Sequence, residues 1–169
     1  PERRGHGFTT QHLFALDSSL PPVCGFARTA TIRAAEPPRE TAAQMAAKRT
    51  AYYEYVAAGP MPTIAGIQDL DPVPGIGAFW GEVQTTVHKG LGAVGAVTNG
   101  SFRDVPDSAR GFHLIGGKVG PSHAYVHLVE IGCSVTVHGL TVSTNDIVHM
   151  DQHGAVMIPP EAVKKIPAA

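Results

Sequence analysis

The chain has 169 residues, of which 43% are hydrophobic and 16% are charged, and its formal net charge is −1. This length suits one compact domain with a core of its own, and the composition excludes a disordered chain. The sequence has no run of lysine or arginine, which excludes the basic surface that a nucleic-acid partner would need.

The two cysteines, Cys24 and Cys133, lie far apart in the sequence and form no CxxC pair. Free thiols in a reducing cytosol explain them more simply than a disulfide does. No apolar run is as long as a membrane span, and no secretory leader follows Pro1. We therefore expect a cytoplasmic protein without a membrane partner.

The first half of the chain predicts a strand, a helix and then a crossover unit. Small, β-branched and polar residues alternate over Ala27–Ala34, which predicts a strand. The alanine-rich segment Thr41–Ala58 has helical apolar spacing and ends at Gly59-Pro60, so it predicts a helix.

The crossover unit spans the middle of the chain. It comprises a strand over Thr63–Ile67, a Gly- and Pro-rich loop over Asp69–Gly81, a helix over Glu82–Lys89 that ends at Gly90, and a strand over Ala93–Thr98. A strand–loop–helix–strand order predicts a right-handed crossover between parallel strands.

The second half is rich in short β segments separated by Gly, Asn and Asp turns. The predicted strands are Phe112–Ile115, Ala124–Ile131, Ser134–His138, Ile147–Met150 and Ala155–Ile158. A last helix is expected after Pro159-Pro160, carrying Ala162 to Ile166. The fold class is therefore α/β: one domain over residues 1–169, with a crossover half followed by a mostly antiparallel β half.

Two segments follow the carboxyl ends of the parallel strands, where ligands bind in such sheets. They are Pro74–Gly81, which opens a helix, and Asn99–Asp104. Arg103 offers a planar fork for a carboxylate, while Asp104 and Glu82 offer oxygen ligands that suit Mg²⁺ or Mn²⁺. These groups would stabilise a pyruvate enolate. A turn and a surface salt bridge are the plainer interpretations of the same residues.

A resemblance extends this interpretation. The acidic residue of Gly81-Glu82 is followed by twenty residues and then Arg103-Asp104, and Gly92–Asp104 and Val135–Pro159 follow the same family order. This pattern resembles the 4-hydroxy-4-methyl-2-oxoglutarate aldolases within the family of the regulator of ribonuclease E activity A, the RraA-like family. The resemblance implies a swivelling β/β/α fold, whose first helix would lie upstream of Pro1.

The resemblance also implies roles for individual residues. Asp104 would hold the divalent metal, partly through water, Glu82 would lie near the metal's water ligands, and Arg103 would clamp the substrate carboxylate. The backbone that would cradle the pyruvyl group belongs to Gly77, Ala78, Phe79, Trp80 and Gly81. The family further implies homotrimers or hexamers with active sites between subunits.

The function expected from this resemblance is a metal-dependent lyase that cleaves the C–C bond of a 4-hydroxy-2-oxo acid, with oxaloacetate decarboxylation as a second activity. The alternative is a non-catalytic regulatory protein that binds a ribonuclease or another protein. Position 104 favours the enzyme, because the ribonuclease-inhibiting namesake resembles the family without the Arg-Asp pair. Ser122, His123 and Tyr125 lie in Gly120–His127, which does not match the aldolases, so their role stays open.

Two other chemistries are disfavoured by the sequence. His123 and His127 would lie about 13 Å apart on the predicted strand, too far to share a zinc ion. No lysine is expected at the end of a core strand, and Lys118 is placed in a turn, so a Schiff base is not favoured. The remaining histidines, of which His88 is one, are mostly expected at ordinary surface or strand positions.

Overall fold

The computed structural model describes residues 7–166, so both ends of the predicted domain lie outside the described residues. The helices are α1 (Ala42–Ala57), α2 (Glu82–Gly90) and α3 (Pro160–Val163), with a 3₁₀ turn η1 (Val105–Asp107). The strands are β1 (Phe14–Ala15), β2 (Val23–Arg33), β3 (Thr63–Asp69), β4 (Ala78–Trp80), β5 (Ala93–Phe102), β6 (His113–Val119), β7 (His127–Ile131), β8 (Val135–Val137), β9 (Leu140–Val142), β10 (Ile147–Asp151) and β11 (Gly154–Ile158). Within this range no helix is long and apolar enough to cross a membrane.

The centre of the main sheet is parallel. Its strand order is β1–β6–β5–β3–β2–β10–β11, with β4 added to β5 and β7 added to β2. Strand β3 pairs in parallel with β2 on one side and with β5 on the other, so the predicted pairing across α2 is confirmed. Strand β6 also pairs in parallel with β5, which corrects its assignment to the antiparallel half. Strands β7, β10 and β11 pair antiparallel, as predicted.

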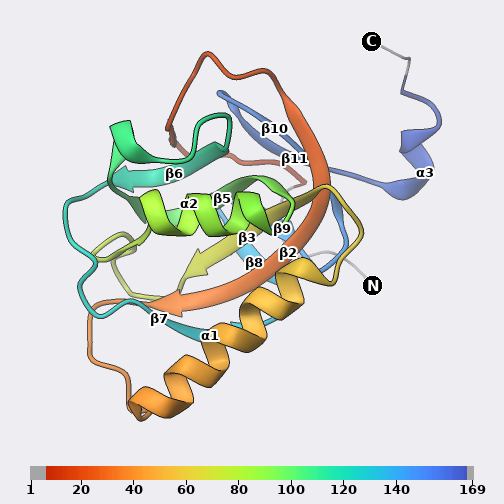
Figure 1. Cartoon of the computed structure of the whole chain (residues 1–169). Coiled ribbons are helices and arrows are strands. Elements are labelled where there is room, and N and C mark those ends of the chain that lie inside the picture. Colours follow the sequence, from red (N-terminus) through yellow and green to blue (C-terminus); the bar gives the residue numbers. More distant parts are fainter. Residues whose placement is uncertain (1–6, 167–169) are drawn as a thin grey trace.

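Both faces of this sheet are covered, as parallel sheets require (Figure 1). Successive residues of a strand point to opposite faces, so Ile64 joins one core cluster and Ala65 the other. The helix-side cluster includes Tyr52 of α1 and Trp80 of β4. The opposite cluster is closed by the β8–β9 hairpin, and Gly66 leaves room for that hairpin's Val135 and Val142.

Several predicted boundaries were wrong. Strand β5 runs on to Phe102, and β4 lies inside the predicted loop, because the two segments pair with each other. Strand β7 begins at His127 instead of Ala124, and α3 ends at Val163 instead of Ile166. The prediction missed β1 and β9, and β9 exists because His138 and Gly139, at φ 49° and 89°, form a two-residue hairpin turn.

His88 is fully buried in α2, which corrects its expected surface or strand position. Its Nδ1–H donates to the Gln84 carbonyl at 2.7 Å, so its Nε2 accepts from the Tyr52 hydroxyl at 2.8 Å. This bond links α2 to α1 through the core. Burial lowers the pKa of His88 from 6.5 to about 4.

The folded state therefore binds the His88 proton less tightly than the unfolded chain does. As the pH falls from 6.5 to 4, the unfolding free energy should fall by about 3 kcal/mol on account of His88 alone. Urea unfolding of His88→Gln across this range should show a shallower loss. Tyr52→Phe keeps the imidazole and should keep the slope. Equal slopes for the wild type and His88→Gln would contradict this assignment.

Candidate active site

The loop between β3 and β4 begins beside β5, because the side chain of Asn99 in β5 forms hydrogen bonds with the last residue of β3. Asn99 Oδ1 accepts the N–H of Asp69 at 2.8 Å, and its Nδ2 donates to the Asp69 carbonyl at 3.0 Å. Backbone pairing between β3 and β5 ends at Ile67 and Thr98. The Asn99 side chain supplies the next two hydrogen bonds between these strands in place of the backbone. The loop after β3 therefore starts beside β5.

Two buried carboxylates hold the rest of this loop, and the sequence analysis did not identify either of them. Asp69 accepts the N–H groups of Asp71 at 2.9 Å and Gly75 at 2.8 Å, while Asp71 accepts those of Ala34 and Ala35, both at 2.8 Å. Burial raises the pKa of the Asp69 carboxyl, and its two N–H donors act in the opposite direction. An Asp-x-Asp pair directly after a strand was the available sequence signal.

The segment predicted to cradle a pyruvyl group is buried along its whole length, from Gly77 to Gly81. Ala78 N–H donates to the Ser122 carbonyl at 2.8 Å, so this amide is already paired within the protein. A Cβ on Gly77 would come within 2.6 Å of the His123 carbonyl. Ser122 and His123 therefore cover the segment through their backbone, and a cradle for a ligand would use other amides.

Arg103 is held in place from two sides. Its backbone N–H donates to the Trp80 carbonyl at 3.0 Å, and Nη1 donates to the Ala78 carbonyl at 2.7 Å. Nε lies 3.2 Å from Oδ2 of Asp104, and the side chain is 25% exposed. Nη2 has no hydrogen-bond partner among residues 7–166, so part of the fork stays available to a carboxylate.

Asp104 is held in a left-handed backbone conformation, at φ 52° and ψ 42°. Its carbonyl accepts from the N–H groups of Asp107 and Ser108, which fixes this turn. The Glu82 N–H, at the start of α2, points to Asp104 Oδ2 at 3.4 Å. A Cβ on Gly81 would lie 2.5 Å from the same oxygen, so the close approach depends on glycine.

Arg103, Asp104 and the start of α2 therefore meet at the carboxyl ends of the parallel strands, as the sequence analysis expected. The Asp104 side chain is 38% exposed, and Glu82 is exposed beside it. Within the described range, no group of three or more His, Cys, Asp or Glu residues is arranged so that it could hold a metal ion. The arrangement offers one or two carboxylates to a hard cation and a guanidinium to an anion.

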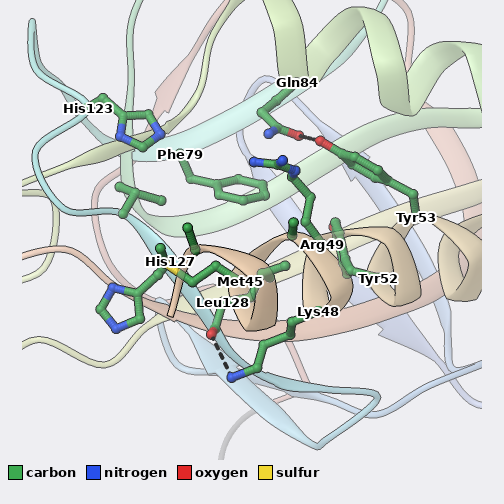
Figure 2. A pocket seen from close by; sticks show the side chains of 13 residues that line it. Met45, Lys48, Arg49, Tyr52, Tyr53, Phe79, Gln84, His123, His127 and Leu128 are labelled. Carbon is green, nitrogen blue, oxygen red and sulfur yellow. Dashed lines mark hydrogen bonds between the residues drawn. The ribbon is translucent and has the colours of Figure 1, made fainter. Parts of the chain in front are cut away.

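A pocket of about 390 Å³ opens elsewhere, between α1 and β7 (Figure 2). Phe79 and His123 line it, whereas Arg103, Asp104 and Glu82 do not. The Arg-Asp pair stands on open surface, and we place the candidate site there because of its chemistry. Tyr125 is 54% exposed and does not line the pocket.

Two premises of the sequence analysis are corrected. Lys118 lies in β6 opposite Ser101 and packs against Gly75, so it is at the end of a parallel strand and not in a turn. It is exposed, whereas a Schiff-base lysine is typically desolvated. His123 precedes β7, so strand spacing does not describe its distance from His127.

A comparison with known families identifies the family of this chain. A family model described as RraA-like (Aldolase/RraA) matches residues 3–157. The chain belongs to this family. A search of curated proteins found no match for this RraA-like chain.

Solved structures share its fold. RraAS2 of Streptomyces coelicolor, described as an unusual member of the RNase ES inhibitor RraA family, is 21% identical with a TM-score of 0.71, covering 94% of this chain and 75% of its own. The RNA-processing inhibitor RraA from Thermus thermophilis is 15% identical with a TM-score of 0.63, and the match covers 96% of this chain and 89% of that one. A structure described as novel cellulases from microbes associated with the gut is 17% identical with a TM-score of 0.75, and the match covers 94% of this chain and 68% of that one. At these identities the likeness shows the fold alone.

Gly81→Ala tests the close approach of Asp104 in this RraA-like chain. The added methyl should displace the Asp104 carboxylate, because its Cβ would lie 2.5 Å from Oδ2. The unfolding free energy should change by less than about 1 kcal/mol, because Oδ2 ends an exposed side chain that can turn towards solvent, so the displacement should be seen chiefly in the amide shifts. Gly90→Ala, at the other end of α2, meets no atom within 4 Å and is the matched control. Urea unfolding and amide NMR shifts of Glu82 and Asp104 would report both variants. Equal effects from the two substitutions would contradict this account.

Proposed function

We propose that this RraA-like chain is a divalent-metal-dependent lyase that cleaves the C–C bond of a 4-hydroxy-2-oxo acid. Oxaloacetate decarboxylation, which passes through the same enolate, is proposed as a second activity. The observation that carries the proposal is the pairing of Arg103, with Nη2 unengaged within the described residues, and an exposed Asp104 carboxylate beside the start of α2.

The donor set suits Mg²⁺ or Mn²⁺. Asp104 Oδ2 faces Arg103 and the Glu82 N–H, whereas Oδ1 makes no hydrogen bond or ion pair within residues 7–166. Asp104 would hold the cation directly and Glu82 would hold its water ligands, in the water-rich mode that is usual for magnesium. A bound cation would supply charge stabilisation for the enolate left when the C–C bond breaks.

The chain's own residues would bind and orient the substrate. Arg103 would pair with the carboxylate of the 2-oxo acid, and its bond to the Ala78 carbonyl would keep the guanidinium from swinging away. The exposed Glu82 carboxylate would take the proton of the substrate's 4-hydroxyl group through a neighbouring water. The C3–C4 bond would then break to give a carbonyl product and an enolate, and the same proton would return to C3 of the enolate. These roles need no movement of the backbone, since β4 and β5 are paired beneath the site.

We propose that a neighbouring subunit completes the site, in a trimer or hexamer. Large apolar side chains are exposed on the segments that adjoin the Arg-Asp pair: Val73, Ile76, Val83, Val105, Val119 and Tyr125. Electrostatic stabilisation weakens in bulk water, so an enolate needs a more enclosed site than this open surface. A second copy of the chain would cover the apolar side chains and exclude water together.

The alternative is a non-catalytic protein that binds a ribonuclease or another protein. One structure of the same fold is described as an RNA-processing inhibitor and another as an unusual member of an RNase ES inhibitor family. The exposed apolar side chains also suit a protein partner. The lyase is preferred because its chemistry needs an oriented guanidinium and a carboxylate packed closely against Gly81. An inhibitory surface requires neither of them.

Asp104→Asn tests the metal. Asparagine tolerates the left-handed conformation, so the fold should persist while the charge that attracts the cation is lost. Pyruvate release from a panel of 4-hydroxy-2-oxo acids with Mg²⁺ or Mn²⁺ should fall at least about 100-fold. Chelation of the native protein should abolish activity, and added metal should restore it. Activity that survives chelation would exclude this mechanism.

Arg103→Lys tests the carboxylate clamp. Lysine keeps the charge but loses the planar fork and the bond to the Ala78 carbonyl, so turnover should collapse. Oxalate should inhibit the variant at least about tenfold more weakly. Arg110→Lys, an exposed arginine away from the pair, is the control and should behave like the wild type. Undiminished inhibition by oxalate would place the carboxylate elsewhere.

A further inference from the structure

The pocket between α1 and β7 is a cavity that the proposed lyase reaction does not use. Its volume of about 390 Å³ is within the usual range for small-molecule sites. The rings of Tyr52, Tyr53 and Phe79 line it, together with Met45, Val126 and Leu128. Tyr52 and Phe79 meet edge to face, with their centroids 6.3 Å apart, so one wall is a rigid aromatic corner.

The polar groups at this pocket favour an anion. Arg49 reaches over Phe79 towards Gln84 (Figure 2), and it has no ion pair or hydrogen bond with any residue of the described chain. Gln84 Oε1 accepts from the Tyr53 hydroxyl at 3.2 Å, which leaves the amide NH₂ as its free end. No aspartate or glutamate lines the pocket.

The neighbouring lysine shows that Arg49 is the available cation. Lys48 Nζ lies 2.6 Å from Glu40 Oε1 and donates to the Leu128 carbonyl at 3.3 Å, so its charge is already compensated. In Figure 2 it points away from Arg49 and towards Leu128. The pocket therefore combines an uncompensated guanidinium and an amide donor with three aromatic rings.

We propose that this pocket binds a small organic carboxylate with an aromatic body. The ring would pack against Phe79 and Tyr53, and the carboxylate would accept from Arg49 and the Gln84 amide. This second site is separate from Arg103 and Asp104 and does not depend on the lyase activity. Phe79 lies between Ala78 and Trp80, whose carbonyls hold Arg103, so the occupant would also touch the strand that positions the clamp.

Titration with benzoate, followed by amide NMR shifts, tests the proposal. Saturable shifts are expected at Tyr53, Phe79 and Gln84, and Arg49→Gln should weaken benzoate binding at least about tenfold. Arg110→Gln, which removes an exposed arginine outside the pocket, should leave binding unchanged. Benzamide, which has the same shape without the charge, should bind more weakly and should not distinguish Arg49→Gln from the wild type.

Three outcomes would overturn this proposal. They are the absence of saturable benzoate shifts, equal benzoate affinity in Arg49→Gln and the wild type, and shifts centred on Arg103 and Asp104 in place of the pocket. Because the assay measures binding alone, a failure here leaves the lyase proposal intact. Conversely, an inactive Asp104→Asn variant that still binds benzoate would support two independent sites.

Discussion

The parallel pairing of β3 with β5 is the constraint on which the candidate site depends. It places the ends of β3 and β5 side by side, although they are far apart in the sequence. Asn99 then forms two hydrogen bonds with the Asp69 backbone, where the backbone pairing of the two strands ends. Because the loop starts beside β5, its later residues can pair with that strand as β4. That second pairing brings Gly81 against Asp104.

The site itself is built on a short ion pair between Arg103 and Asp104. The Asp104 carboxylate faces the Arg103 guanidinium and the first N–H of α2. The pairing leaves Arg103 Nη2 and one carboxylate oxygen without a contact among the described residues, so each partner can still engage a ligand. The aromatic-lined pocket beside α1 lies apart from this pair.

Buried polar residues connect the helices and loops to this site. His88 and Tyr52 join α2 to α1 inside the core. The Asp69 carboxylate binds N–H groups of the β3–β4 loop, and the Asp71 carboxylate binds those of Ala34 and Ala35 after β2. Each pair satisfies polar groups that would otherwise be buried without partners, which keeps the start of α2 and the β3–β4 loop in defined positions. A guanidinium and a carboxylate held this way lose little freedom when a ligand binds.

The sequence by itself determined the fold class, the parallel crossover, the limits of α1 and α2, and the convergence of Arg103 and Asp104 with the loop before α2. These follow from local patterns: Gly and Pro residues that end helices, apolar spacing, and the rule that parallel strands end at one edge. Only the tertiary structure decided that β4 is a strand, that His88 is core, that Lys118 ends β6, and that Arg49 faces an aromatic pocket. Each of those depends on contacts between segments that are distant in the chain. Such contacts do not produce a periodic pattern in the local sequence, so the sequence does not predict them.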